Sequence, residues 1–118
     1  MEKRITIGMD MGDNNHSLCL VDKESKVQER ATVDNTAPAI RKYFRKKEPC
    51  LIAMEAGTHS AWVSRILESL GHEVLVGNPR KLRMIWGGNN KTDEHDAEML
   101  AKVAQFNPEL LYPIHHRG

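Results

Sequence analysis

The sequence predicts a single α/β domain built on a mixed five-stranded sheet, and two observations support this fold class. Three short strand-like segments follow one another at the N-terminus, and the pattern then alternates between helix and strand up to about residue 105. Consecutive short strands favour antiparallel pairing, whereas αβ alternation favours parallel strands flanked by helices. The 118 residues are the size of one ordinary domain.

The first half of the predicted sheet consists of three strands. In residues 4–10 apolar side chains alternate with other types, as in a strand with one buried face. Residues 16–22 form the second predicted strand and residues 27–33 the third, and residues 12–15 provide the turn between the first two. We therefore expect an antiparallel meander.

Helices and strands alternate in the remainder of the chain. Thr36 is expected to cap a helix over residues 37–47, and Thr58 a second helix over residues 59–70 that ends at Gly71. The near-continuous apolar run over residues 50–54 is typical of a strand that is buried on both faces. The other predicted segments are a strand at 74–76, a short helix around 79–86, a loop over 86–90, a helix from Thr92 or Asp93 to about 105, and a tail from Pro108 without a clear pattern.

Composition and charge narrow the class of protein. The chain is 40% apolar and 28% charged with a net charge of +1, and no apolar run approaches the ~20 residues of a membrane span. The N-terminus lacks the apolar core of a signal peptide, so we expect a cytoplasmic protein without a membrane partner. Cys19 and Cys50 fit neither a zinc spacing nor a disulfide framework, and we interpret them as reduced structural thiols.

Four carboxylates lie where a divalent metal ion could bind. Asp10 and Glu55 each close an apolar strand-like run just before a glycine turn. The order of elements is that of the ribonuclease H-like fold, in which the first and fourth strands are neighbours, so these two acids would emerge side by side. Asp93 and Asp96 lie three residues apart at the start of the last predicted helix. Hard cations such as Mg²⁺ or Mn²⁺ prefer several oxygen ligands that converge on one point.

Each of these acids also has a structural interpretation. An aspartate before a turn is common, whereas Glu55 at the end of a buried strand is costly unless it is paired, solvated or metal-bound. Acids in the first turn of a helix suit its dipole, but one acid meets that need and two repel each other, so we expect the pair to be displaced when no cation is present. Two Mg²⁺ ions between the four acids would activate a nucleophile and stabilise the leaving oxygen of a phosphodiester.

Basic residues cluster in two places. The ordinary meaning of such clusters is a solvated helix face, and the alternative is contact with phosphates. We favour the second cluster as a nucleic-acid contact because it leads directly to the acidic pair. The first cluster is Arg41, Lys42, Arg45, Lys46 and Lys47, and the second is Arg80, Lys81, Arg83 and Lys91.

Five segments resemble one known family in their order and spacing, namely residues 7–10, 54–58, 70–74, 78–81 and 91–97. They resemble the N-terminal DEDD domain of insertion-sequence transposases of the "one-ten" family, which includes the pilin-gene invertases. The resemblance implies a Holliday-junction-resolvase-like, ribonuclease H-type domain over residues 1–106. It also implies that Asp10, Glu55, Asp93 and Asp96 are its catalytic and metal-binding tetrad.

The sequence departs from the family's pattern at two points. Many members carry a lysine shortly after the first aspartate, where this chain has Asp13, Asn14 and Asn15. Members also continue into a helical linker and a C-terminal domain that bears a serine, so residues 107–118 would lead into a region that this chain lacks. We therefore expect the isolated fragment to be inactive in recombination.

The family's known biology implies partners as well as an activity. It implies metal-dependent cleavage and transfer of DNA strands, with DNA as the partner, a homo-oligomer in the full-length protein and, in some members, a structured guide RNA. Two other functions stay open. The Asp10–Gly12 turn also resembles the phosphate-binding turn of an actin-like ATP-binding lobe, in which the acidic pair would have no role. The chain could instead be a non-catalytic module for nucleic-acid binding or oligomerisation.

Overall fold

The computed structural model describes residues 5–79, 93–111 and 113–114, and it describes side chains in the last helix from Asp96 onward. Several predictions fall outside these residues. They are the short helix around 79–86, the loop over 86–90, the cap at Thr92, and the basic residues Arg80, Lys81, Arg83 and Lys91.

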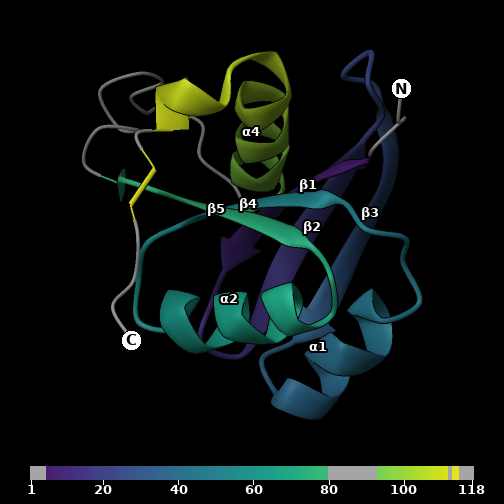
Figure 1. Ribbon diagram of the computed structural model, residues 1–118, viewed down its shortest axis with the longest axis vertical. Helices are drawn as coiled ribbons and strands as arrows, with labels where there is room; N and C mark the ends of the chain where they lie inside the picture. The colour runs from purple at the N-terminus through teal and green to yellow at the C-terminus, as the bar shows by residue number, and fades with distance from the viewer. Residues whose placement is uncertain (1–4, 80–92, 112, 115–118) are drawn as a thin grey trace.

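Within the described part of the chain, five strands form one mixed sheet in the order β3-β2-β1-β4-β5 (Figure 1). The first three strands pair antiparallel as the expected meander, while β4 is parallel to both β1 and β5. The predicted adjacency of the first and fourth strands is therefore confirmed. The strands are β1 (Thr6–Met11), β2 (Asn15–Val21), β3 (Val27–Asp34), β4 (Leu51–Glu55) and β5 (Glu73–Gly77).

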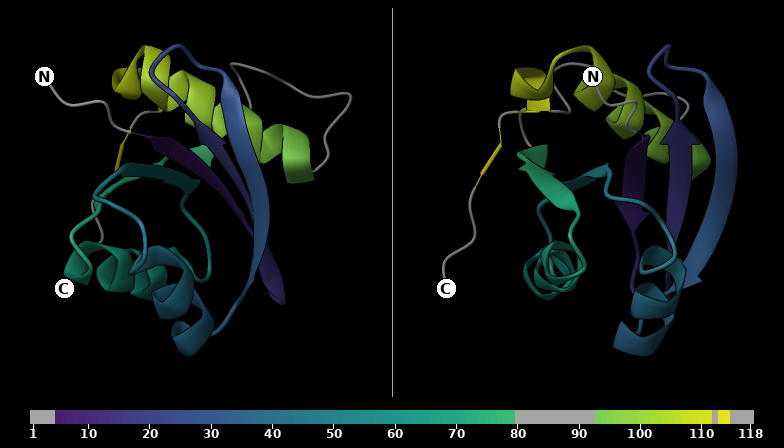
Figure 2. Two further views of the ribbon diagram at one scale, coloured as in Figure 1. Left: turned by 90° about the vertical axis from the view of Figure 1, so that its right-hand side faces the viewer. Right: turned by 45° about the vertical axis from the view of Figure 1, so that its right-hand side comes forward.

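Helices cover both faces of the sheet. Figure 2 shows α1 (Ala37–Phe44) and α2 (Ser60–Ser69) on one face and α4 (Asp93–Phe106) on the other. Successive side chains of a strand point to opposite faces. Ile7 and Met9 accordingly belong to the main core beneath α1 and α2, whereas Gly8 faces α4. None of the helices in the described residues is long and apolar enough to cross a membrane.

Helix α4 packs directly on the backbone of β1. A Cβ atom at Gly8 would lie 1.8 Å from the carbonyl oxygen of Ala97 and 2.7 Å from the backbone nitrogen of Ala101. Ala97 and Ala101 are fully buried, and they form a small cluster with Cys19 and Val21. Small side chains on both elements thus bring the helix closer to the sheet than an ordinary side chain at Gly8 would allow.

The start of α2 differs from the prediction. The N-cap residue is His59 and it makes no side-chain capping bond, so the cap assigned to Thr58 is wrong. Ser60, the first helical residue, instead closes the preceding turn, because its hydroxyl accepts a hydrogen bond from the Gly57 N–H and donates one to the Gly57 carbonyl, both at 3.0 Å. The cap predicted at Thr36 is confirmed, since its hydroxyl accepts from the Ala39 N–H at 3.2 Å.

Two further boundaries differ from the expectation. Helix α1 ends at Phe44, and residues 45–47 form a turn in which the Lys47 N–H donates to the Phe44 carbonyl at 3.1 Å. The tail folds back onto the domain through a short 3₁₀ helix, η1 (Pro108–Leu111), which buries Leu111 completely. Beyond it Ile114 forms an antiparallel bridge to Val76 of β5.

Candidate active site

Asp10 and Glu55 line one pocket at the carboxyl ends of β1 and β4. The register pairs Met9 with Met54, so the two acids follow at matching positions of neighbouring parallel strands. The pocket has a volume of about 150 Å³, and its rim includes Asp13 and His59. The structure therefore brings together the two strand-borne acids that the sequence singled out.

The alternation of side chains places both acids on the α4 side of the sheet. Asp10 lies two residues after Gly8, which faces α4. Glu55 lies two residues after Ala53, which packs against Leu100 and Ala104 of α4. Asp10 and Glu55 therefore point toward the face that α4 covers.

Helix α4 runs antiparallel to β1, so its first turn lies at the level of Asp10. The Thr6 hydroxyl donates to Gln105 Oε1 at 2.7 Å near the end of the helix, and Gly8 faces Ala97 and Ala101. Two further strand residues advance by about 6.6 Å, which corresponds to about four residues of helix. The helix begins at Asp93, so the start of α4 stands beside the end of β1.

Asp96 carries a buried oxygen that the described residues leave without a hydrogen-bond partner. This atom is Oδ1, and the residue directly precedes Ala97 at the contact with Gly8. A buried carboxylate oxygen without a partner is costly, and a hard cation would supply the missing interaction. The donor set of this region therefore fits a divalent metal ion.

The described acids do not form a closed metal centre by themselves. Among the residues with described side chains, no three Asp, Glu, His or Cys side chains lie close enough together to hold one ion. The side chain of Asp93 lies outside the described part, as do the four basic residues predicted to contact nucleic acid. The tetrad of Asp10, Glu55, Asp93 and Asp96 stays a prediction.

A buried histidine that sequence reasoning did not single out holds the turn after Asp10. His16 is fully buried; its Nδ1 accepts from the Gly12 N–H at 3.3 Å, so its Nε2 carries the proton and donates to Asn35 Oδ1 at 2.9 Å. Burial lowers the pKa of His16, the hydrogen bond to Asn35 opposes this, and nearby His59 lowers it further. The alternation of His16 with Leu18 and Leu20 on one strand face indicates this burial in the sequence.

His59 stands at the rim of the pocket and is fixed on both sides. Its Nδ1 accepts from the indole N–H of Trp62 at 3.1 Å, and its Nε2 donates to Asp13 Oδ1 at 3.2 Å. The side chain of Asp13 is 91% exposed, so this pair faces solvent. No spacing rule in the sequence predicts the pair, because Asp13 and His59 come from separate turns.

Comparison with known proteins gives the chain a family. Residues 7–117 match the model of the IS110-type DEDD family, which is described as "Transposase". A probable family 20 transposase of Pseudomonas aeruginosa is 32% identical over 106 residues, which cover 90% of this chain and 30% of that protein. The chain thus spans less than a third of the length of this relative.

Solved structures show the same fold. Thermus thermophilus RuvC in complex with a Holliday junction substrate matches with a TM-score of 0.62 at 10% identity, over 89% of this chain and 97% of that one. A second T. thermophilus RuvC structure matches with a TM-score of 0.54 at 12% identity, over 87% and 96% of the two chains. The predicted ribonuclease H-like fold is therefore confirmed. The family match extends over nearly all of the sequence, and the chain belongs to the IS110-type DEDD transposases.

Proposed function

We propose that this chain is the N-terminal catalytic domain of a DNA transposase or site-specific recombinase that cleaves and transfers DNA strands with a divalent metal ion. The observation that carries the proposal is the pairing of Asp10 and Glu55 in one pocket at adjacent strand ends. The family match and the RuvC-like fold support it. We place the domain at residues 1–106, with residues 107–118 leading toward a C-terminal region.

The proposed ligands of the metal are Asp10, Glu55, Asp93 and Asp96. Mg²⁺ or Mn²⁺ bound there would stabilise negative charge on the phosphate and on the attacking and leaving oxygens. The chain's own contribution is positioning. Asp10 and Glu55 are held by hydrogen-bonded neighbouring strands, while the close contact at Gly8 holds the first turn of α4 beside them.

DNA is the partner that we propose for this site. We propose Arg80, Lys81, Arg83 and Lys91 as phosphate contacts because the described residues on either side of this segment lie beside the pocket. Gly77 pairs with Glu55 at one end, and α4 begins at Asp93 at the other. For the full-length protein we further propose that it is cytoplasmic and forms a homo-oligomer. A guide RNA is a further partner that we propose for it.

Two alternatives are separated from this function by particular observations. An actin-like lobe would leave the acids at the start of α4 without a role, and the unpartnered oxygen of Asp96 argues against that. A non-catalytic binding module would need no metal ion at the pocket. Metal binding therefore separates the catalytic proposal from the binding module.

The experiment is a metal titration followed by thermal unfolding. A ligand that binds the folded state alone raises the melting temperature, so Mg²⁺ or Mn²⁺ should stabilise the chain. Asp10→Asn and Glu55→Gln should each remove most of this shift while the protein stays folded. Glu68→Gln removes the same charge from an exposed position on α2 and should leave the shift intact. A full shift in Asp10→Asn would exclude this residue as a ligand.

A further inference from the structure

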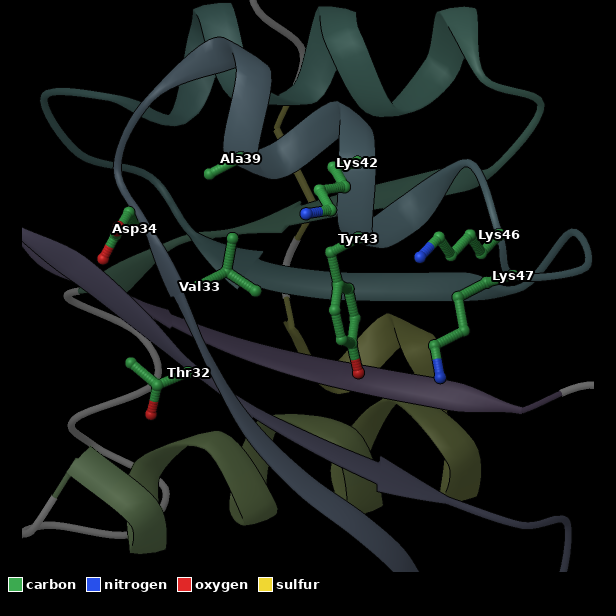
Figure 3. Close-up of a pocket in the computed structure, with 8 residues that line it drawn as sticks. All are labelled: Thr32, Val33, Asp34, Ala39, Lys42, Tyr43, Lys46 and Lys47. Carbon is green, nitrogen blue, oxygen red and sulfur yellow. The ribbon is translucent and has the colours of Figure 1, made fainter.

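A second groove lies outside the acidic pocket, between α1 and the edge strand β3. It is an open groove of about 530 Å³ (Figure 3). Residues 32–34 of β3 form one side, and Lys42, Tyr43, Lys46 and Lys47 form the other. This is the first basic cluster of the sequence, which the proposed function does not use.

The lysines of this groove fall into two kinds. Lys47 is engaged, because its ammonium lies 3.3 Å from Glu29 Oε1 and 4.9 Å from the centre of the Tyr43 ring. Lys42 and Lys46 are exposed, and no carboxylate among the described residues pairs with either. Two ammonium groups without a paired carboxylate therefore line the same groove, together with the exposed carboxylate of Asp34 on the β3 side.

The floor of the groove is fixed before any ligand arrives. The half-buried Tyr43 donates its hydroxyl to Glu29 Oε2 at 3.3 Å, and its ring packs edge-on against Phe44 at 5.0 Å between centroids. Burial and the Glu29 carboxylate raise the pKa of Tyr43 to about 12, so the hydroxyl remains a donor at neutral pH. The groove thus combines a partly apolar floor with more ammonium groups than carboxylates, since Lys42 and Lys46 outnumber Asp34 once Lys47 is paired with Glu29.

A structural role accounts for part of this arrangement only. Basic residues in the last turn stabilise a helix through its dipole, and Lys42 lies there. Lys46 lies beyond the C-cap residue Arg45, so it is not one of the basic residues in the last turn of α1. Charge complementarity therefore favours a polyanion as the occupant of the groove.

The groove and the two acids lie on different faces of the sheet, because α1 and α4 cover opposite faces and Asp10 points toward α4. Thr32 pairs with Ser17, and Ser17 pairs with Asp10, so the three residues form one row across β3, β2 and β1. Two strand spacings amount to about 10 Å. The β3 side of the groove therefore lies two strands away from Asp10, at the edge of the sheet.

We propose that the groove between α1 and β3 binds the phosphate backbone of duplex DNA through Lys42 and Lys46, so that the DNA substrate of the acidic pocket is also held at the β3 edge of the sheet. This inference rests on the proposed function, because it takes the DNA to be the substrate of that pocket. The half-buried Tyr43 ring offers the sugars a partly apolar surface beside Lys42 and Lys46.

The test measures how the affinity for a fluorescein-labelled duplex depends on salt, by fluorescence anisotropy without any metal ion. Each phosphate contact contributes about −0.9 to the slope of log K against log salt, so Lys42→Gln/Lys46→Gln should make the slope shallower by about 1.8. Lys23→Gln/Lys26→Gln removes the same charge at the exposed turn between β2 and β3 and should leave the slope unchanged. Lys42→Arg/Lys46→Arg keeps both charges and should retain the parental slope.

Each contrary outcome overturns the inference. The groove does not contact DNA if Lys42→Gln/Lys46→Gln keeps the parental slope of log K against log salt. The same holds if both double-glutamine variants reduce this slope equally, or if the parent shows no salt-dependent binding. An RNA duplex that alone loses affinity in Lys42→Gln/Lys46→Gln would assign the groove to RNA and overturn the DNA assignment. Because the assay contains no metal, a failure here leaves the metal titration of Asp10→Asn unaffected, and the reverse also holds.

Discussion

At the scale of single residues, His16 makes the stability of the domain depend on pH. Its buried ring accepts a hydrogen bond at Nδ1, which a protonated ring could not do, and burial lowers its pKa from the ordinary 6.5. The unfolded chain therefore binds a proton below about pH 6.5 that the folded chain does not bind. The free energy of unfolding should be highest above this pH and should fall as the pH decreases through it toward the lowered pKa.

Urea unfolding between about pH 8 and about pH 5 measures this effect. His16→Asn should be less stable than the parent at the alkaline end and should show a weaker loss of stability toward acid. His59→Gln removes the neighbouring imidazole that lowers the pKa of His16 further, so it should weaken the pH dependence much less than His16→Asn does. A parental pH dependence in His16→Asn would show that another group causes it.

The sequence predicts some individual side chains well and others poorly, for a physical reason. The adjacency of Asp10 and Glu55 follows from where their strands end and from the order of the elements. The pattern of apolar residues predicts both. The unpartnered oxygen of Asp96 and the pair of Asp13 with His59 depend on how separate elements dock. Local patterns do not encode such contacts.

At the scale of elements, the contact between α4 and β1 is the one that positions the site. Gly8→Ala places a methyl group 1.8 Å from the Ala97 carbonyl oxygen, so the helix must move. We expect a loss of about 3 kcal/mol in the free energy of unfolding, measured in urea, together with a smaller Mg²⁺-induced rise in melting temperature. The free energy of unfolding and the Mg²⁺-induced rise in melting temperature should decrease together, because both depend on the contact between α4 and β1.

Gly57→Ala provides the matched control for this substitution. Gly57 also lines the acidic pocket, but a Cβ atom there meets nothing within 4 Å. The variant should therefore keep both the stability and the metal response of the parent. A Gly8→Ala protein as stable as Gly57→Ala would contradict the close packing of α4 on β1.

Elements with strong local patterns were predictable, and elements that depend on distant partners were not. The cap at Thr36 and the left-handed Gly71, with a φ of 95°, follow from residue type at a helix end. The short η1 helix and the bridge of Ile114 to Val76 exist because β5 offers them a partner. The N-cap position falls at His59 without a side-chain capping bond, and the Ser60 hydroxyl bonds to Gly57 in the preceding turn.

At the scale of the whole molecule, we expect this chain to provide one part of a recombinase. The Pseudomonas aeruginosa relative is more than three times as long as the matched region. We therefore expect recombination to require regions that correspond to the unmatched part of this relative. The isolated 118-residue chain should show little or no excision or inversion of a marked DNA segment. The full-length protein should recombine that segment, and Asp96→Ala within it should abolish the reaction.

Either of two results would contradict this view of the molecule. Robust recombination by the isolated chain would show that no further region is required. Unchanged recombination by the full-length Asp96→Ala protein would show that the acid on α4 is not part of the chemistry. Full-length Glu68→Gln is the control, since its exposed carboxylate lies on α2 at the opposite face of the sheet from α4.

The central position of β1 gives the two halves of the proposed acidic site unequal resistance to local unfolding. β1 is bonded on both edges, to β2 and to β4, so opening the backbone around Asp10 requires disruption of the middle of the sheet. Asp93 and Asp96 stand in the first turn of a helix, where fraying is least costly. A bound cation would therefore mainly order the first turn of α4, and the free energy cost of that ordering would reduce the metal affinity. Metal affinity could then be tuned by changes in that helical turn, while the strands that carry Asp10 and Glu55 keep their structure.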